Sequence, residues 1–252
     1  MTLAPAIWVE TCKLVASRVV RSTAGLLVGG VGLLAASLTA AAAAGNEQVL
    51  AQLGPLASAD GWTRFLGVAT QITAAAGLLA FGVVLSWATG REFTDGTISG
   101  LFALPVTKAI LLTAKLMVFL VWTAAVAVAL LAVVTAVGFA LGLGLPDRPA
   151  VAALGRLAVL TLLSGLLAVP AAWAATIGRG LLPGIASTVI TIVLAQVAVV
   201  AGGGAWFPIA APALWASDPS AVSALQLVGV AVVPLLFGVL AARAWSRLQL
   251  DR

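Results

Sequence analysis

The sequence contains no histidine and only one cysteine, Cys12. A single cysteine cannot form a disulfide within the chain. Without histidine, haem ligation and most zinc or copper chemistry lose their usual ligand. We therefore expect this chain to hold no metal ion and no cofactor of its own.

Charged residues are also scarce. They make up 8% of the 252 residues, against 62% hydrophobic residues and a mean hydropathy of +1.18. A soluble domain carries about 25% charged residues, so lipid must surround most of this chain. In lipid, only helix bundles and closed barrels satisfy the backbone, and the long, non-alternating apolar runs exclude a barrel. The sequence predicts an all-α integral membrane protein.

Six apolar runs are long enough to cross a bilayer at 1.5 Å per residue. They lie at about 23–44, 65–89, 109–140, 152–177, 182–201 and 223–242. Pro170 predicts a kink in the fourth run. Gly25 and Gly29 form a small-xxx-small pair that favours close helix packing in the first. Residues 4–21 mix apolar and charged side chains at helical spacing, which predicts an amphipathic helix lying in the membrane interface. We therefore expect one transmembrane domain over 1–252.

The positive charges are unevenly distributed between the two ends of these runs. Six spans place both termini on one side, where ten basic residues gather, against three on the other. The ten are Lys13, Arg18, Arg21, Arg91, Lys108, Lys115, Arg179, Arg243, Arg247 and Arg252, and the three are Arg64, Arg148 and Arg156. This bias predicts cytoplasmic termini. It also explains the net charge of +5 without a nucleic-acid partner, which we do not expect. Charges at the N-terminal segment further predict that no signal peptide is cleaved from it.

The spans lack the residues that catalysis or ion coupling requires. No phosphate-binding loop of the Gly-x-x-x-x-Gly-Lys-[Ser/Thr] type is present, and every acidic residue falls at the end of a predicted span or in a connector, whereas ion pathways place carboxylates within spans. We expect neither an enzyme nor an ion-driven carrier. The larger side chains within spans are Gln71, Gln196 and Trp122. They are candidates for a cargo path, although interhelical hydrogen bonds and core packing are the alternatives.

A polar segment over 91–108 separates the second and third runs. Asp95 is suited to cap a short helix, which would place Ile98, Leu101, Phe102 and Pro105 on one apolar face at helical spacing. Such a helix could bind a groove on a partner protein or lie on the lipid surface, and the sequence favours neither reading by itself.

The same segment resembles the signature of ATP-binding cassette type-2 permeases. The matching residues are Glu92, Gly96-Thr97, Pro105 with Lys108 three positions later, and Ala114-Lys115 opening the third span. The N-terminal pair Glu10-x-x-Lys13 is similar to the family's elbow helix, and the order of elements agrees over the whole chain. Lys108 departs from the commoner arginine, which keeps the charge but loses a planar fork.

This resemblance implies a mechanism. Two permease chains, identical or related, pair in a bacterial cytoplasmic membrane. Each permease chain engages a separate cytosolic ATPase subunit, so that a complex holds two of these subunits. The ATPase subunits bind ATP and magnesium. Residues 92–105 would form the coupling helix that fits the ATPase. The direction implied is export, with a drug or antibiotic as the leading cargo and a peptide or lipid next. The nearly uncharged spans favour an apolar or amphiphilic cargo.

Two other classes of function remain open from the residues alone. A non-transporting scaffold or sensor subunit would need a partner but no cargo-dependent ATP turnover. A stand-alone channel or carrier would move solute without any ATPase, although the lack of ionisable groups within the spans argues against it.

Overall fold

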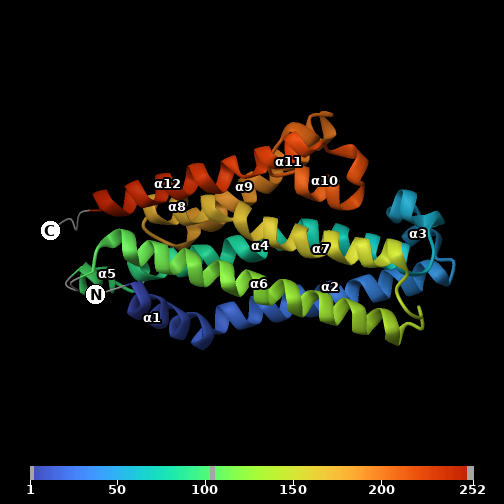
Figure 1. Cartoon of the computed structure of the whole chain (residues 1–252), viewed down its shortest axis with the longest axis horizontal. Helices are drawn as coiled ribbons and strands as arrows, with labels where there is room; N and C mark the ends of the chain where they lie inside the picture. Colours follow the sequence, from blue (N-terminus) through green and yellow to red (C-terminus); the bar gives the residue numbers. More distant parts are fainter. Residues whose placement is uncertain (1–2, 103–105, 249–252) are drawn as a thin grey trace.

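The computed structural model describes residues 3–102 and 106–248. These residues form helices and no strand, which confirms the predicted all-α class. Six helical stretches are long and apolar enough to cross a membrane: Arg18–Ala43, Gly61–Thr94, Lys108–Ala140, Arg148–Ile177, Leu181–Val200 and Ala224–Arg247. Each contains all or nearly all of one predicted run; three of the runs extend one residue beyond the helix. The helices lie side by side along one long axis (Figure 1).

The N-terminal helix is shorter than predicted. Helix α1 covers Leu3–Ala16 and α2 covers Arg18–Ala43, so Arg18 and Arg21 belong to the first span and not to the amphipathic helix. Ser17 makes the break, since its backbone is extended and its hydroxyl accepts from the Val20 amide at 3.3 Å. This is a standard N-cap. Trp8 of α1 is 71% exposed, which suits a helix that lies in the membrane interface.

Helix α4 is longer than the apolar run that predicted it. It covers Gly61–Thr94, 34 residues, or about 51 Å at 1.5 Å per residue. Its last turn therefore contains Glu92, which the sequence had placed in a separate coupling helix over 92–105. The separate helix that does exist, α5, covers only Ile98–Phe102. Helix α6 then runs over Lys108–Ala140, capped by Thr107.

Two of the spans are broken helices, and proline accounts for both breaks. The fourth span consists of α7, Arg148–Leu167, and α8, Val169–Ile177, with Pro170 in the first turn of α8 as the predicted kink requires. The sixth consists of α11, Ala224–Val230, and α12, Val232–Arg247, with Pro234 in the first turn of α12. Proline has no amide hydrogen to continue the hydrogen bonding from the preceding turn.

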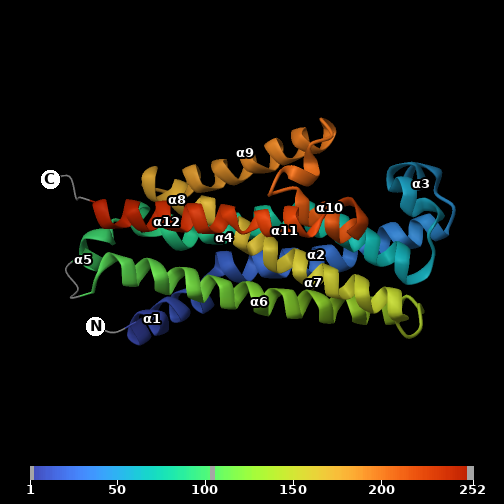
Figure 2. The ribbon, with the colours of Figure 1, turned by 45° about the horizontal axis from the view of Figure 1, so that its top comes forward.

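The two ends of the bundle differ. We call the end where α1 begins and α12 stops the terminal end, and it also holds α5 (Figures 1 and 2). The opposite, distal end holds the connectors: α3, Glu47–Leu53; η1, Gly54–Ser58; and the segment between the fifth span α9, Leu181–Val200, and α11. That segment contains η2, Gly204–Trp206; α10, Ala211–Ser217; and η3, Pro219–Ala221. Helix α10 packs back against α7 and α4.

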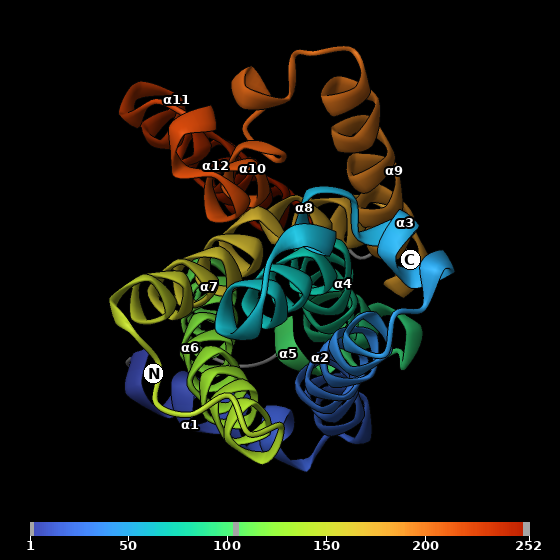
Figure 3. The same ribbon diagram turned by 90° about the vertical axis from the view of Figure 1, so that its right-hand side faces the viewer.

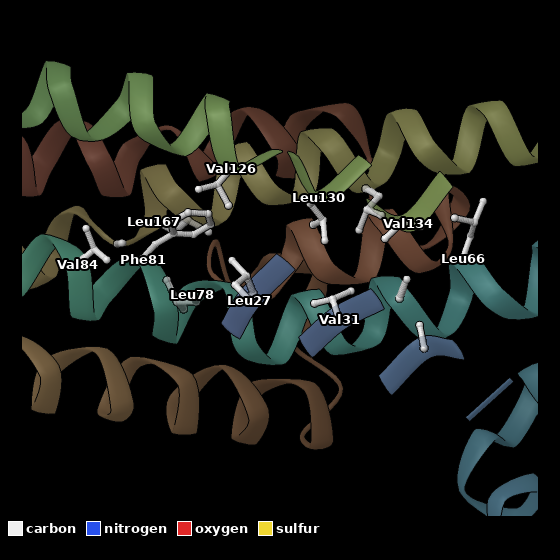
Figure 4. Close-up of a cluster of buried hydrophobic side chains, with 14 of the residues drawn as sticks. Leu27, Val31, Leu66, Leu78, Phe81, Val84, Val126, Leu130, Val134 and Leu167 are labelled. Atoms are coloured by element: carbon white, nitrogen blue, oxygen red, sulfur yellow. The ribbon is translucent and has the colours of Figure 1, made fainter. Parts of the chain in front are cut away.

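Helix α4 is the centre of the bundle. It packs against α2, α6, α7, α8, α9 and α10, as the view along the long axis also indicates (Figure 3). Its buried side chains meet those of its neighbours in one apolar core, where Phe81 and Leu78 of α4 lie near Leu27 of α2 and Leu167 of α7 (Figure 4).

Small residues bring the backbones close at chosen points. A side chain added at Gly90 would lie 2.6 Å from the backbone of Gly180, and one at Gly82 would lie 2.3 Å from the Thr188 hydroxyl. Close approach through glycine is a principal source of helix packing in membranes, where lipid is as apolar as the side chains. The predicted Gly25–Gly29 pair has no such neighbour within the described chain.

We predict that Gly90→Ala lowers the free energy of unfolding by about 1–3 kcal/mol, because the new methyl group would press on backbone that cannot rotate away. Gly29→Ala, in open surroundings, should change it by less than about 1 kcal/mol. Thermal unfolding of the two purified variants in the same detergent tests the pair. Equal stability of both variants would contradict the packing described here.

Candidate functional site

Four charged side chains meet at the terminal end, and we call them the ionic cluster: Glu10, Lys13, Glu92 and Lys115. The Lys115 Nζ donates to Glu92 Oε1 at 2.6 Å and to Glu10 Oε2 at 2.9 Å. The Lys13 Nζ donates to Glu10 Oε1 at 2.8 Å and to Glu92 Oε1 at 3.0 Å. The cluster thus joins the first helix, the end of α4 and the beginning of α6.

Three members of the cluster are buried. The side chains of Lys115, Glu92 and Glu10 are 1%, 7% and 8% exposed. Two cations face two carboxylates, so the cluster carries no net charge, which is the condition under which such groups are tolerated away from water. One acceptor remains open, because Glu92 Oε2 is buried with no hydrogen-bond partner among the residues that the structure describes. Among the described residues, no group of three or more metal-ligating side chains gathers.

Lys13 closes the cluster on its solvent side, with 35% of its side chain exposed. Burial acts to lower the pKa of Lys13, but the hydrogen bond and charge of Glu10, together with Glu92, outweigh it and raise the pKa above 10.5. The ammonium form is therefore favoured in the folded protein more than in the unfolded chain.

Local sequence explains why these four side chains converge. Helix α1 buries Ala6, Glu10 and Leu14 at a spacing of four residues, so one face of the helix turns toward the bundle with Glu10 in its middle. Lys13 lies one turn beyond Glu10. Lys115 lies about two turns into α6 on its buried side.

The turn that follows α4 explains two more of the predicted residues. Asp95 does not cap a following helix as predicted; it ends α4, and its carboxylate accepts from Arg91 Nε at 2.8 Å. Gly96 has a φ of +67°, and this left-handed conformation after a helix favours glycine strongly. Thr97 is exposed and its carbonyl accepts from the Leu101 amide at 3.2 Å, which begins α5.

Helix α5 turns part of its apolar side inward. Leu101 packs against a second apolar cluster built around Leu111, Leu112 and Trp245. Ser99 and Gly100 are exposed. Phe102 ends α5, but its side chain lies outside what the structure describes, as does Pro105. The predicted apolar docking face is therefore at least partly occupied within the chain.

Lys108 connects the 91–108 segment to the other terminus. Its Nζ donates to the backbone carbonyl of Leu248, which follows α12. Nearby, Trp245 of α12 is fully buried and donates from Nε1 to the Thr176 hydroxyl at 3.0 Å. No local pattern predicts this contact, because the two residues lie 69 positions apart.

A cavity of about 300 Å³ lies beside the ionic cluster. Its walls come from α1, α4, α5 and α6, and include Glu10, Leu14, Trp87, Leu101 and Lys115. Arg91 lies over the Trp87 ring, 5.2 Å from its centroid. The cavity therefore lies between α5 and the ionic cluster, and Leu101 borders it while also packing against the second apolar cluster.

The three candidate cargo-path residues do not meet. Gln71 lies in the distal half of α4 and lines a second cavity at that end. Trp122 packs against Phe81 and Phe119, with ring centroids 5.7 and 6.0 Å away. Gln196 is exposed on α9. The ring contacts of Trp122 favour the core-packing alternative, and no single path contains all three.

Together, the fold and the site define a multi-pass α-helical membrane protein. Ion pairs between side chains join its N-terminal interfacial helix to the second and third spans. Residues 6–198 match the family model described as ABC-2 family transporter protein. The match runs from α1 into α9 and covers more than half of the chain, so the chain belongs to this family of membrane transport components. No curated protein sequence matches the chain.

We predict that Lys115→Met destabilises the protein by about 3–5 kcal/mol, because it leaves two carboxylates buried with only the half-exposed Lys13 to compensate. The double variant Lys115→Met/Glu92→Gln should recover part of this loss, since it removes the uncompensated charge as well. Thermal unfolding in detergent measures both. A double variant no more stable than the single one would argue against the pairing.

The raised pKa of Lys13 gives a pH prediction. Its contribution to stability should be fully present below pH 10.5, the pKa of the unfolded chain, and be lost as the pH rises through the higher folded value. The difference in melting temperature between the wild type and Lys13→Met should therefore stay constant from about pH 6 to 9 and shrink above about pH 10.5. A difference that already disappears near neutral pH would contradict this assignment.

Proposed function

We propose that this chain is the membrane-spanning permease of an ATP-driven exporter, powered by a separate ATPase subunit. Membership of the ABC-2 family supports the permease role. In the proposed complex, two such chains, identical or related, pair with two ATPase subunits, which bind ATP and magnesium. The chain itself performs no hydrolysis.

The observation that carries this proposal is that the ionic cluster and α5 border the same cavity at the terminal end. Helix α5 presents Ser99 and Gly100 to the surface, and Thr97 just before it is also exposed. A three-residue turn joins α5 to α4, whose last turn holds Glu92. A partner that moves α5 would therefore pull on Glu92. Through Lys115 and Glu10, the same force would reach α6 and α1.

This geometry separates two roles that the sequence had assigned to one segment. The exposed residues of α5 would contact the ATPase, whereas Glu92, Lys115, Glu10 and Lys13 are buried or half-buried and would transmit its motion. A neutral cluster of paired charges suits transmission, because displacing one member leaves buried charge uncompensated and so obliges the others to follow.

We further propose a bacterial cytoplasmic membrane location, with the terminal end in the cytoplasm. The ten-to-three distribution of basic residues supports this orientation. The terminal end would then face the ATPase and the distal end the outside. The cargo we propose is apolar or amphiphilic, with a drug or antibiotic first and a peptide or lipid next, because charged side chains are nearly absent from the apolar core.

Co-purification tests docking. We expect the full chain in nanodiscs to recover an ATPase subunit from its own cells. Ser99→Trp, on the exposed side of α5, should reduce this recovery at least tenfold. Ser220→Trp, an equally exposed serine at the distal end, is the matched control and should have no effect. Equal recovery with both variants would contradict docking at α5.

Coupling is tested separately in the reassembled complex. Glu92→Gln should retain the ATPase but lose at least tenfold in cargo-stimulated ATP turnover, because one charge of the cluster is removed without changing the surface of α5. ATPase recovery without any cargo-dependent turnover in the wild type would instead indicate a scaffold or sensor subunit. Solute movement without an ATPase would indicate a channel or carrier.

A further inference from the structure

The second cavity, at the distal end, is lined by polar side chains that use few of their hydrogen-bonding atoms within the described chain. Its volume is about 420 Å³. It lies between η1, the first half of α4, the first half of α7, and α10. Leu56, Leu66 and Ala153 contribute apolar wall, while Thr70, Gln71 and Arg156 contribute hydrogen-bond donors.

Arg156 is the principal feature of this cavity. It lies eight residues after Arg148, about 12 Å along the helix, near the beginning of the predicted span over 152–177. An arginine at this depth can extend its guanidinium toward the membrane surface, so the cavity in front of it, and not its depth, is the feature that points to a site. The Nε of Arg156 donates to the Ala216 carbonyl of α10 at 3.3 Å. In the described part of the chain its other guanidinium nitrogens bond to nothing, and no carboxylate pairs with it.

Two side chains of α4 complete the donor set. Thr70 is 4% exposed and lines the cavity, yet its hydroxyl makes no hydrogen bond to any described residue. Gln71, the next residue, is exposed and lines the cavity, with no partner for its amide among them. The Thr70 hydroxyl is not one of the fully enclosed polar atoms that lack a partner, so it opens onto the cavity and is available to a ligand.

The only carboxylate on the cavity wall, within the described residues, belongs to Asp218. It is fully exposed, and its Oδ1 accepts from the Ser220 hydroxyl at 2.7 Å and amide at 2.9 Å. These bonds lower the pKa of Asp218. The carboxylate is thus held in its own turn, in water, where its charge is screened, whereas Arg156 is partly buried and less screened.

We propose that this distal cavity is a binding site for the acidic head group of an amphiphile. The oxygens of a carboxylate or phosphate would accept from the guanidinium of Arg156, the Thr70 hydroxyl and the Gln71 amide. Arginine suits such oxygens because its parallel N–H groups can bind two of them together. The apolar wall from Leu56, Leu66 and Ala153 would cover the beginning of the hydrophobic tail.

The site refines the cargo class of the exporter, and identifying its ligand as cargo rests on the proposed function. The binding itself does not, since it needs neither ATP nor a partner chain. An amphiphile with a positively charged head would be rejected, because Arg156 would be brought against a like charge.

The test is binding of radiolabelled dodecyl phosphate to the full chain in phosphatidylcholine nanodiscs, with empty nanodiscs subtracted. We expect saturable binding that Arg156→Gln weakens at least tenfold. Arg148→Gln, an exposed arginine on the same helix outside the cavity, is the matched control and should change the affinity less than twofold. Asp218→Asn, which removes the nearby negative charge, should strengthen binding about twofold. Dodecyltrimethylammonium should not bind above the level of empty nanodiscs.

Two further variants keep the test decisive if Arg156→Gln fails to insert. Ala153→Leu narrows the cavity without changing charge, and Thr70→Val removes one donor at nearly constant volume; both should weaken binding at least threefold. Unchanged affinity in these variants, or equal binding of the cationic analogue, would overturn the site. Nanodiscs that contain phosphatidylglycerol identify the source of the ligand: competition indicates a membrane lipid, and its absence a free amphiphile.

The two proposals can fail separately. If dodecyl phosphate binds as expected but no ATPase couples to the chain, the site stands and the exporter proposal fails. If ATP turnover is coupled but Arg156→Gln binds dodecyl phosphate as well as the wild type does, the exporter stands and the site fails.

Discussion

The arrangement of the terminal end depends on one interaction, the buried pairing of Lys115 with Glu92 and Glu10. Placing these charges away from water is unfavourable unless each finds its partners in the correct geometry. The position of α1 against the bundle is therefore constrained by charge as well as by apolar contact. A helix that binds only through an apolar stripe could slide along its neighbours, whereas Glu10 must remain within hydrogen-bond distance of two lysines.

Along the rest of the bundle, close contact takes the place of charge. Lipid offers no hydrophobic driving force for helices to associate, and α4 compensates with glycines that admit neighbouring backbone or side chains, as at Gly82 and Gly90. Apolar packing fills the space between them, including the edge-to-face contacts of Phe81 with Phe119 and Trp122. Helix α4 contacts α2, α6, α7, α8 and α9. A displacement of its last turn would therefore be transmitted to most of the other spans.

The two ends of the bundle present opposite solutions to the same problem of polar groups near lipid. At the terminal end, acids and bases neutralise each other almost completely, with one carboxylate oxygen of Glu92 left open. At the distal end, the guanidinium of Arg156 has a single carbonyl partner and a cavity before it. A cluster whose charges pair with one another is suited to transmit force between helices. A guanidinium with unused donors beside a cavity is suited to receive a ligand.

Much of this protein is determined by sequence alone. The class, the six spans and the kink at Pro170 follow from the length of the apolar runs and from proline's missing amide, which are local properties. Capping already limits such reasoning, since Ser17 ended the interfacial helix earlier than its composition suggested. The resemblance to type-2 permeases singled out Glu92 and Lys115 for coupling, and Glu10 and Lys13 for the elbow helix. Only the tertiary structure decided that they form one cluster, that Glu92 faces inward and that Gln71, Trp122 and Gln196 lie apart. The reason is physical: burial and ion pairing depend on contacts between residues up to 105 positions apart, and periodicity along one helix carries no information about which neighbour its face will meet.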